Sequence, residues 1–206
     1  MKTQTLTGML IALFLLPSIC VAQTPHQVGG FVLGKNIAEY EKLIKMKTAF
    51  HLRHMISIME VEIDRVEGFK SGLISYGTCS VPGKIVRIKL KYADSTRKYY
   101  DTLLKHFKKR FDEPAEWRGD PFHVVTAWKW SFVDKENNRI SLILQHNTKD
   151  EEEKMGNSVK LTMWNLIEDE RRCFEEKHPD FQKTSKKGAH VKKGSDSIDW
   201  DRLIPR

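Results

Sequence analysis

The sequence predicts an α+β fold, with an antiparallel sheet of about six strands built from two helix-plus-three-strand units and with helices covering one face. Two observations predict this class. Five of the six predicted strand segments alternate apolar and polar residues with a period of two, which is typical of half-buried antiparallel strands. Each group of three strands follows a segment with apolar residues at helical spacing, and a last helical segment follows the sixth strand.

The first unit is expected within residues 29–92. Asn36 and Glu39, three residues later, form a capping-box pattern that predicts a helix ending near residues 45–47. Strands are predicted over 55–66, 73–79 and 85–92, and they are separated by glycine turns and by Pro82-Gly83.

The second unit is expected within residues 94–177. A helix begins at Asp94 or Ser95 and carries one apolar stripe: Tyr100, Leu103, Leu104, Phe107 and Phe111. Strands are predicted over 123–133, 140–146 and 158–164, followed by a helix over 166–177. Residues 86–90 and 159–163 are similar, 73 positions apart, and each leads into a helix. The third and sixth strands are therefore expected to connect the sheet to a helix in the same way.

Residues 1–22 have the layout of a secretory signal peptide. Lys2 carries the only charge, residues 9–16 are an unbroken apolar run, and Cys20-Val21-Ala22 precedes Gln23. We expect cleavage near Ala22 and a periplasmic or secreted bacterial protein, with no transmembrane segment in the remaining chain. Lipidation at Cys20 is the alternative interpretation of this leader.

Cleavage would leave two cysteines, Cys79 and Cys173. An even number of cysteines in an oxidising compartment predicts a disulfide, which would stabilise the fold by roughly 4 kcal/mol on the loop-entropy estimate. Two separate buried thiols are the alternative.

The domain is expected to span residues 23–177. Residues 178–206 are expected to be a flexible, disordered basic tail, because the stretches 183–188 and 192–195 are polar and charged. Residues 177–206 hold eight Lys or Arg and four Asp, in a chain with a formal net charge of +8. The chain ends in an apolar segment that includes Trp200, Leu203 and Ile204. This segment is a candidate docking motif, and an ordinary chain end is the alternative.

Four candidate binding residues follow from the strand pattern. Arg87, Lys89 and Lys91 alternate with the apolar residues of the third strand and are expected on its outward face. Trp164 has the opposite parity to Val159, Leu161 and Met163, and is therefore expected to be exposed. A plain solvated sheet face is the competing interpretation of these charges.

A resemblance adds to this interpretation. Phe111-Asp112-Glu113-Pro114 ends a predicted helix, and Trp128-Lys129-Trp130 and Ile140-Ser141-Leu142 follow in the next two strands. The pattern resembles the helix-plus-hairpin unit of small bacterial envelope proteins, among them the β-lactamase-inhibitor protein and the small lipoprotein of outer-membrane assembly. The opening Phe31-Val32-Leu33-Gly34 before a helix is also similar to theirs. The resemblance covers a few short patches. It implies a binding module with an exposed sheet face and carries over no site residues.

The sequence lacks the HExxH, CxxC and GxSxG motifs and a phosphate-binding glycine loop. We therefore expect a non-catalytic binding or protein-interaction module, with no cofactor and no metal site. Its expected partner is a protein or an acidic envelope component, because an exported protein rarely meets nucleic acid. The alternatives are a cell-envelope hydrolase without a recognisable local motif and a peripheral membrane protein whose basic tail contacts the membrane surface.

Overall fold

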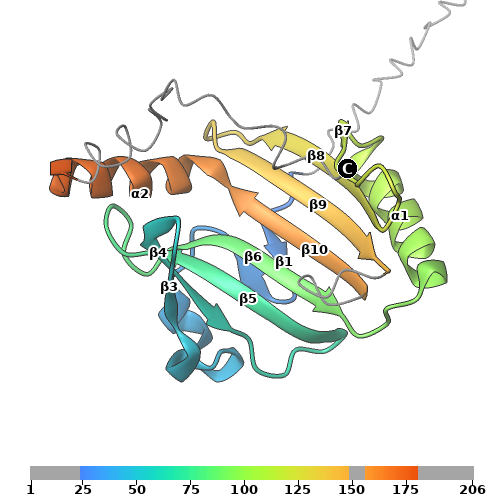
Figure 1. Ribbon diagram of the computed structural model, residues 1–206, viewed down its shortest axis with the longest axis horizontal. Coiled ribbons are helices and arrows are strands. Elements are labelled where there is room, and N and C mark those ends of the chain that lie inside the picture. The colour runs from blue at the N-terminus through green and yellow to red at the C-terminus, as the bar shows by residue number, and fades with distance from the viewer. Residues whose placement is uncertain (1–23, 149–155, 181–206) are drawn as a thin grey trace, which may run out of the picture.

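An eight-stranded antiparallel sheet forms the body of the molecule (Figure 1). The computed structural model describes residues 24–148 and 156–180. The strand order is β3-β4-β5-β6-β10-β9-β8-β7. Six long strands match the predicted ones: β4 (Met55–Glu62), β5 (Phe69–Gly77), β6 (Ile85–Tyr92), β8 (Val125–Val133), β9 (Arg139–Asn147) and β10 (Gly156–Met163).

The sheet has two more strands than the six expected from the sequence. The extra strands, β3 (Phe50–Leu52) and β7 (Glu116–Trp117), lie at its two edges. They have three and two residues, and an alternation of apolar and polar residues cannot be recognised over so short a length.

The two three-stranded units meet at β6 and β10, which pair antiparallel in the middle of the sheet. Ile88 lies opposite Leu161 in this register. These two residues are also equivalent positions of the similar segments noted in the sequence. Helix α1 (Arg97–Phe111) follows β6, and helix α2 (Trp164–Lys177) follows β10. Each of the two strands is followed by a helix, as predicted, but the connections are not equivalent, because four residues separate β6 from α1 whereas α2 follows β10 directly.

The N-terminal segment differs from the prediction in two respects. A two-stranded hairpin, β1 (Gln27–Val28) and β2 (Phe31–Val32), stands where a single extended segment was expected. The first predicted helix consists of two 3₁₀ segments, η1 (Ile37–Leu43) and η2 (Met46–Thr48). The capping box is present, since the Ala38 amide donates to Asn36 Oδ1 over 3.0 Å and the Asn36 amide to Glu39 Oε1 over 3.2 Å.

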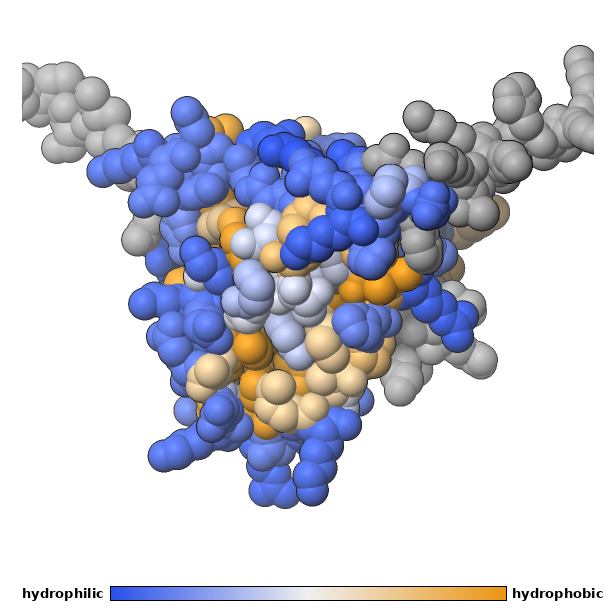
Figure 2. Space-filling model, turned by 90° about the vertical axis from the view of Figure 1, so that its left-hand side faces the viewer, coloured by the Kyte–Doolittle hydropathy of each residue, from blue (hydrophilic) through white to orange (hydrophobic). Residues whose placement is uncertain are grey.

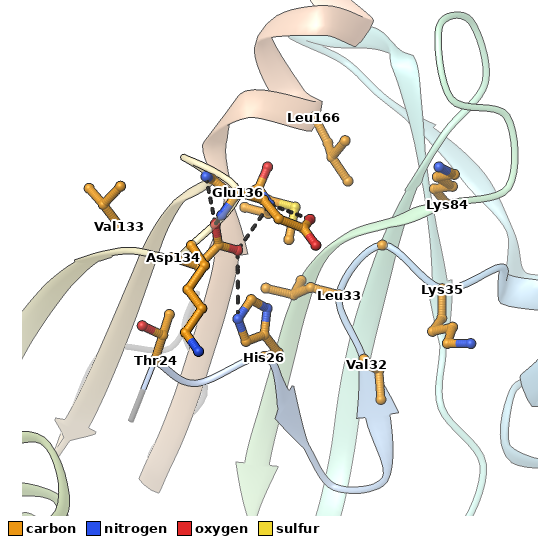
Figure 3. Close-up of a pocket in the computed structure, with 14 residues that line it drawn as sticks. Thr24, His26, Val32, Leu33, Lys35, Lys84, Val133, Asp134, Glu136 and Leu166 are labelled. Atoms are coloured by element: carbon orange, nitrogen blue, oxygen red, sulfur yellow. Dashed lines mark hydrogen bonds and ion pairs between the residues drawn. The ribbon is translucent and has the colours of Figure 1, made fainter. Parts of the chain in front are cut away.

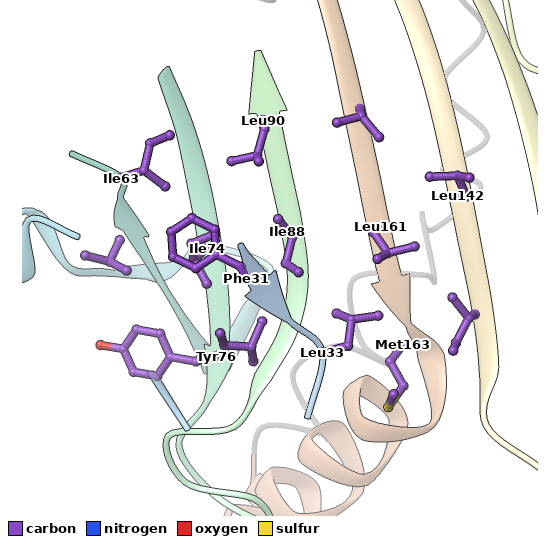
Figure 4. Close-up of a cluster of buried hydrophobic side chains, with 14 of the residues drawn as sticks. Phe31, Leu33, Ile63, Ile74, Tyr76, Ile88, Leu90, Leu142, Leu161 and Met163 are labelled. Carbon is purple, nitrogen blue, oxygen red and sulfur yellow. The ribbon is translucent and has the colours of Figure 1, made fainter. Parts of the chain in front are cut away.

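One face of the sheet, called here the covered face, carries the main core. Helix α1 contributes Tyr100 and its predicted apolar stripe to this core, and the N-terminal segment contributes Phe31 and Leu33. Figure 4 shows Phe31 and Leu33 among side chains of the central strands. The strand residues that define the covered face include Val61, Ile74, Ile88, Leu90, Trp130, Leu142 and Leu161.

Helix α2 does not cover the same face, and the expectation that all helices lie on one face is wrong. Ile167 of α2 packs on Ile58 and Val86 in a separate cluster. Ile58 lies three residues from Val61 along β4, so the two side chains point to opposite sides of the sheet. Helix α2 therefore crosses to the other side, over the ends of β4, β5 and β6.

The cysteines form the predicted disulfide, with Cys79 and Cys173 joined and their Cα atoms 5.9 Å apart. The bond ties α2 to the loop between β5 and β6. On the side of the molecule where α2 ends, charged residues surround apolar and near-neutral ones (Figure 2). The exposed apolar side chains of η2, β3 and β4 are Met46, Phe50 and Ile56. Within residues 24–148 and 156–180, no helix is long and apolar enough to span a membrane.

Candidate functional site

The face of the sheet opposite the main core, called here the open face, carries the predicted binding residues. Along β6, the half-buried Arg87, Lys89 and Lys91 alternate with the buried Ile88 and Leu90. The prediction that these three cations point away from the core is confirmed. Beyond the end covered by α2, side chains of β6, β10, β9, β8 and β7 line this face.

Strand pairing adds cations from the second unit. Lys160 of β10 lies directly opposite Lys89 of β6. Lys129 of β8 pairs with Glu116 of β7, and Arg118 follows β7. Because each strand alternates, these side chains share the face of Arg87. The open face thus brings together basic residues separated by up to about seventy positions in the chain.

Arg87 and Trp164 line the same groove on the open face, which has a volume of about 390 Å³. Its other lining residues are Arg118, Ala127, Lys129, Ser141, Ile143, Gln145, Lys160 and Thr162. Two residues singled out for different reasons are therefore brought together. Lys89 and Lys91 line a neighbouring groove of about 580 Å³, with Lys45, Lys70 and Glu62 among its other residues.

Trp164 lies where β10 gives way to α2. Its side chain is 42% exposed, as the parity argument predicts. The indole Nε1 donates to the hydroxyl of Ser141 over 3.0 Å. This bond fixes the ring at the end of the groove, so that an apolar surface stands beside the cations.

A buried carboxylate holds Arg87 in place. The Arg87 guanidinium lies 3.8 Å from Glu60 Oε1, and the Ser75 hydroxyl donates to the same oxygen over 2.7 Å. Burial lowers the pKa of Arg87, and the charge of Glu60 partly offsets this effect. An arginine remains charged under these conditions. Arg87 is therefore a fixed cation rather than a mobile surface side chain.

Glu116 organises the other end of the groove. It receives Arg118 Nε at 2.9 Å and Lys129 Nζ at 3.3 Å. Partial desolvation opposes its ionisation, but the hydrogen bond from Lys129 and the charge of Arg118 lower the pKa of Glu116 overall. The carboxylate thus stays ionised and sets the spacing of two cations.

The sequence pattern missed Lys129, Lys160 and Arg118. Lys129 and Lys160 alternate with core residues, so their outward direction could be predicted from the sequence. Their proximity to Arg87 could not be predicted, because it depends on the register between strands far apart in the chain. Other predictions fall outside the described residues: the leader with its cleavage near Ala22, and the tail with Trp200, Leu203 and Ile204. In the part of the chain that the structure describes, no three His, Cys, Asp or Glu side chains are grouped so as to hold a metal ion.

Comparison with known proteins gives no relative. No protein-family model, no curated protein and no solved structure matches this chain. The resemblance to small bacterial envelope proteins stays a prediction, and the functional argument rests on the open face itself.

Proposed function

We propose that this protein is an exported, non-catalytic binding module that holds an acidic partner, a protein or an acidic envelope component, against its open face. The observation that carries the proposal is the groove that Arg87, Arg118, Lys129 and Lys160 line together with Trp164. Glu60 and Glu116 hold three of these cations in ion pairs, but neither carboxylate is among the residues that line the groove.

Charge and shape both support an acidic macromolecule. Clustered cations on one face raise the local concentration of an anionic partner and speed its association. An exposed tryptophan next to arginine is the composition that dominates the energy of many protein interfaces. The groove is open and spread across four strands, β6, β10, β9 and β8, which suits an extended partner better than a small enclosed ligand.

The disulfide supports the proposed compartment. Structural disulfides persist in oxidising environments such as the bacterial periplasm and are rare in the cytosol. The Cys79–Cys173 bond therefore agrees with the export that the leader predicts.

Replacing groove lysines and arginine tests the proposal. The variant Arg118→Gln, Lys129→Gln, Lys160→Gln is compared with a matched control, Lys42→Gln, Lys98→Gln, Lys105→Gln, which removes the same charge elsewhere. The probe is fluorescein-labelled poly-L-glutamate, measured by anisotropy at about 50 mM salt, where surface charges are only partly screened.

We expect the unchanged protein to bind the probe and the groove variant to lose about tenfold in affinity, while the control loses less than about threefold. Binding should shift the emission of the exposed Trp164, and Trp164→Phe should remove that shift. Absent binding by the unchanged protein, or equal losses in both variants, would refute the open face as the site. Circular dichroism checks that each variant is folded.

The two alternatives from the sequence have separate signatures. A hydrolase would turn over an envelope polymer, and a tail-held membrane protein would bind anionic vesicles through residues 178–206. Neither is favoured by a specific contact within residues 24–148 and 156–180.

A further inference from the structure

A third and larger pocket lies away from the open face, where four parts of the chain meet. The N-terminal segment around β1 and β2, Lys84 just before β6, the hairpin between β8 and β9, and the junction of β10 with α2 border a volume of about 860 Å³ (Figure 3). Pockets of 300 to 1,000 Å³ are typical of ligand sites. Its lining includes the apolar Leu33, Met163 and Leu166 and the charged Lys84, Asp134 and Glu136.

The floor of this pocket is apolar. Leu33 and Met163 are 5% and 6% exposed, and Leu166 is half-buried beside them. All three pack into or against the main core. The floor is therefore fixed in place and offers a ready surface for aliphatic side chains.

The two sides of the pocket carry opposite charges. Glu136 stands on one side and Lys84 on the other, with Leu33 and Leu166 between them (Figure 3). Both charged side chains belong to exposed residues. Lys84 forms no side-chain hydrogen bond or ion pair with any residue that the structure describes. Lys35, on the same side as Lys84, lies 3.9 Å from Glu39.

Asp134 pre-organises the acidic side. Its Oδ1 accepts from the Glu136 amide over 2.9 Å and from the Asn138 amide over 2.8 Å. His26 Nε2 lies 3.6 Å from Asp134 Oδ2 and links the hairpin to the N-terminal segment. Asp134 is engaged in these contacts, whereas Glu136 accepts one long hydrogen bond, from Asn138 Nδ2 over 3.4 Å, and is the more exposed of the two carboxylates. Glu136 is therefore the carboxylate placed to meet a ligand.

We infer that this pocket binds a short apolar peptide with both termini free. Its ammonium would meet Glu136, its carboxylate would meet Lys84, and its side chains would lie on Leu33, Met163 and Leu166. An extended tripeptide measures at most about 11 Å, and it fits within the pocket volume. Asp134, Lys35 and Lys135 also line the pocket. Glu136 and Lys84 stand on opposite sides of the apolar floor, and this pair complements a zwitterion better than it does a simple anion or cation.

The inference is independent of the proposed function, because it uses no residue of the open-face groove. The test is isothermal titration calorimetry of the full chain with leucyl-alanyl-leucine. The same peptide is used with an acetylated amino terminus, which removes the positive charge, and with an amidated carboxyl terminus, which removes the negative one.

We expect the free peptide to bind, and each cap alone to weaken binding about tenfold, the effect of losing one charge-assisted hydrogen bond. Lys84→Ala should weaken binding of the free peptide about tenfold and abolish the effect of amidation. Glu136→Gln should do the same for acetylation. Lys42→Ala and Glu41→Gln, exposed on η1, are the matched controls and should leave the affinity unchanged.

Three results would overturn the inference: no binding of the free peptide at millimolar concentration, equal binding of capped and free peptides, or equal losses in the controls. Thermal melts confirm that the variants are folded, which is expected because the replaced side chains are exposed. A failure of the protein to bind poly-L-glutamate would not change the expected tripeptide binding, so the two proposals can be refuted separately.

Discussion

Tyr100 and Tyr40 both carry a phenolic hydroxyl next to the core, but only one of the two hydroxyls has a partner. The Tyr40 hydroxyl accepts a hydrogen bond from the Val32 amide over 3.2 Å. Tyr100 is fully buried under α1, and its hydroxyl finds no partner among the described residues. Burial raises the pKa of Tyr100, and the nearby charge of Arg97 offsets this only in part. A buried hydroxyl without a partner lowers stability.

We predict that Tyr100→Phe leaves the free energy of unfolding unchanged or raises it by up to about 1 kcal/mol, because it removes a desolvated polar group. Tyr40→Phe should lower it by about 1 kcal/mol, since the Val32 amide loses its acceptor. Urea denaturation measures both. A clear loss of stability in Tyr100→Phe would show that its hydroxyl is satisfied, for example by a buried water.

At the scale of elements, strand β8 is bounded by two hairpin loops that each depend on one aspartate. Before β8, Asp120 accepts from the amides of Phe122 and Val125. After β8, Asp134 organises the hairpin to β9. The backbone hydrogen bond from Val125 lowers the pKa of Asp120. Desolvation opposes ionisation of Asp134, but the hydrogen bonds from Asn138 and Glu136 outweigh it and lower its pKa too.

These shifts predict loss of stability in acid. A carboxylate whose pKa is lower in the folded than in the unfolded state stabilises the fold at pH values above the ordinary pKa of the group, which is 3.8 for aspartate. That stabilisation is lost as the pH falls from this value through the lower folded pKa. The double variant Asp120→Asn, Asp134→Asn should therefore be less stable than the unchanged protein at pH 7, and the difference should shrink towards pH 3.

Urea midpoints at the two pH values measure this difference. Asp64→Asn, an exposed site, serves as the control and should show a small effect at both. A gap that stays constant between pH 7 and pH 3 would exclude the two carboxylates as its source.

At the scale of the molecule, the two units are locked together where α2 meets the loop after β5. Cys79 belongs to the first unit and Cys173 to the second. Beside the disulfide, the fully buried Glu170 accepts three amides of that loop, from Thr78, Cys79 and Val81, at 3.0, 2.8 and 2.6 Å.

Gly77 leaves room for this buried carboxylate. A Cβ atom at Gly77 would lie 2.5 Å from Glu170 Oε1 and 2.9 Å from the Val81 carbonyl oxygen. Glycine is therefore required for the close approach of the loop to α2.

We predict that Glu170→Gln lowers the free energy of unfolding by about 3 kcal/mol, because three buried amides then face a neutral and partly repulsive group. Glu176→Gln on the exposed side of α2 should change it by less than about 0.5 kcal/mol. Reduction of the disulfide should cost about 4 kcal/mol on the loop-entropy estimate.

Both contacts hold the same loop. The loss of free energy of unfolding in the reduced Glu170→Gln protein should therefore be smaller than the sum of the losses from the substitution alone and from reduction alone. Denaturation of both proteins with and without reductant gives all four values. Strict additivity would show that the carboxylate and the disulfide act on separate parts of the fold.

The central strands, α1 and the disulfide pair could be predicted from the sequence. The strands and the helix have a local pattern of apolar residues, and the disulfide follows from the number of cysteines left after the leader. Arg87 and Trp164 were placed correctly for the same reason, since alternation along one strand determines their direction. The groove they share was not predictable, as it depends on the register of β6 against β10 and of β9 against β8.

Other features depend on contacts that no local pattern encodes. Glu170 lies on the apolar face of α2, but a carboxylate taken by itself is expected in solvent. Only the amides of the distant loop after β5 make its burial acceptable. The course of α2 onto the other side of the sheet follows from the same contacts. The pocket of Lys84 and Glu136 likewise needs four segments that are far apart in the chain.

The short strands at the two rims of the sheet have a consequence for self-association. β3 and β7 have only three and two residues, and β3 also carries an irregularity between His51 and Leu52. Such short edge strands present few unpaired amides and carbonyls to which a strand of a neighbouring molecule could pair. At high concentration the sheet edges therefore offer little surface on which a fibre could grow. The six long strands between the edges do have the length and β-branched content of aggregation-prone segments.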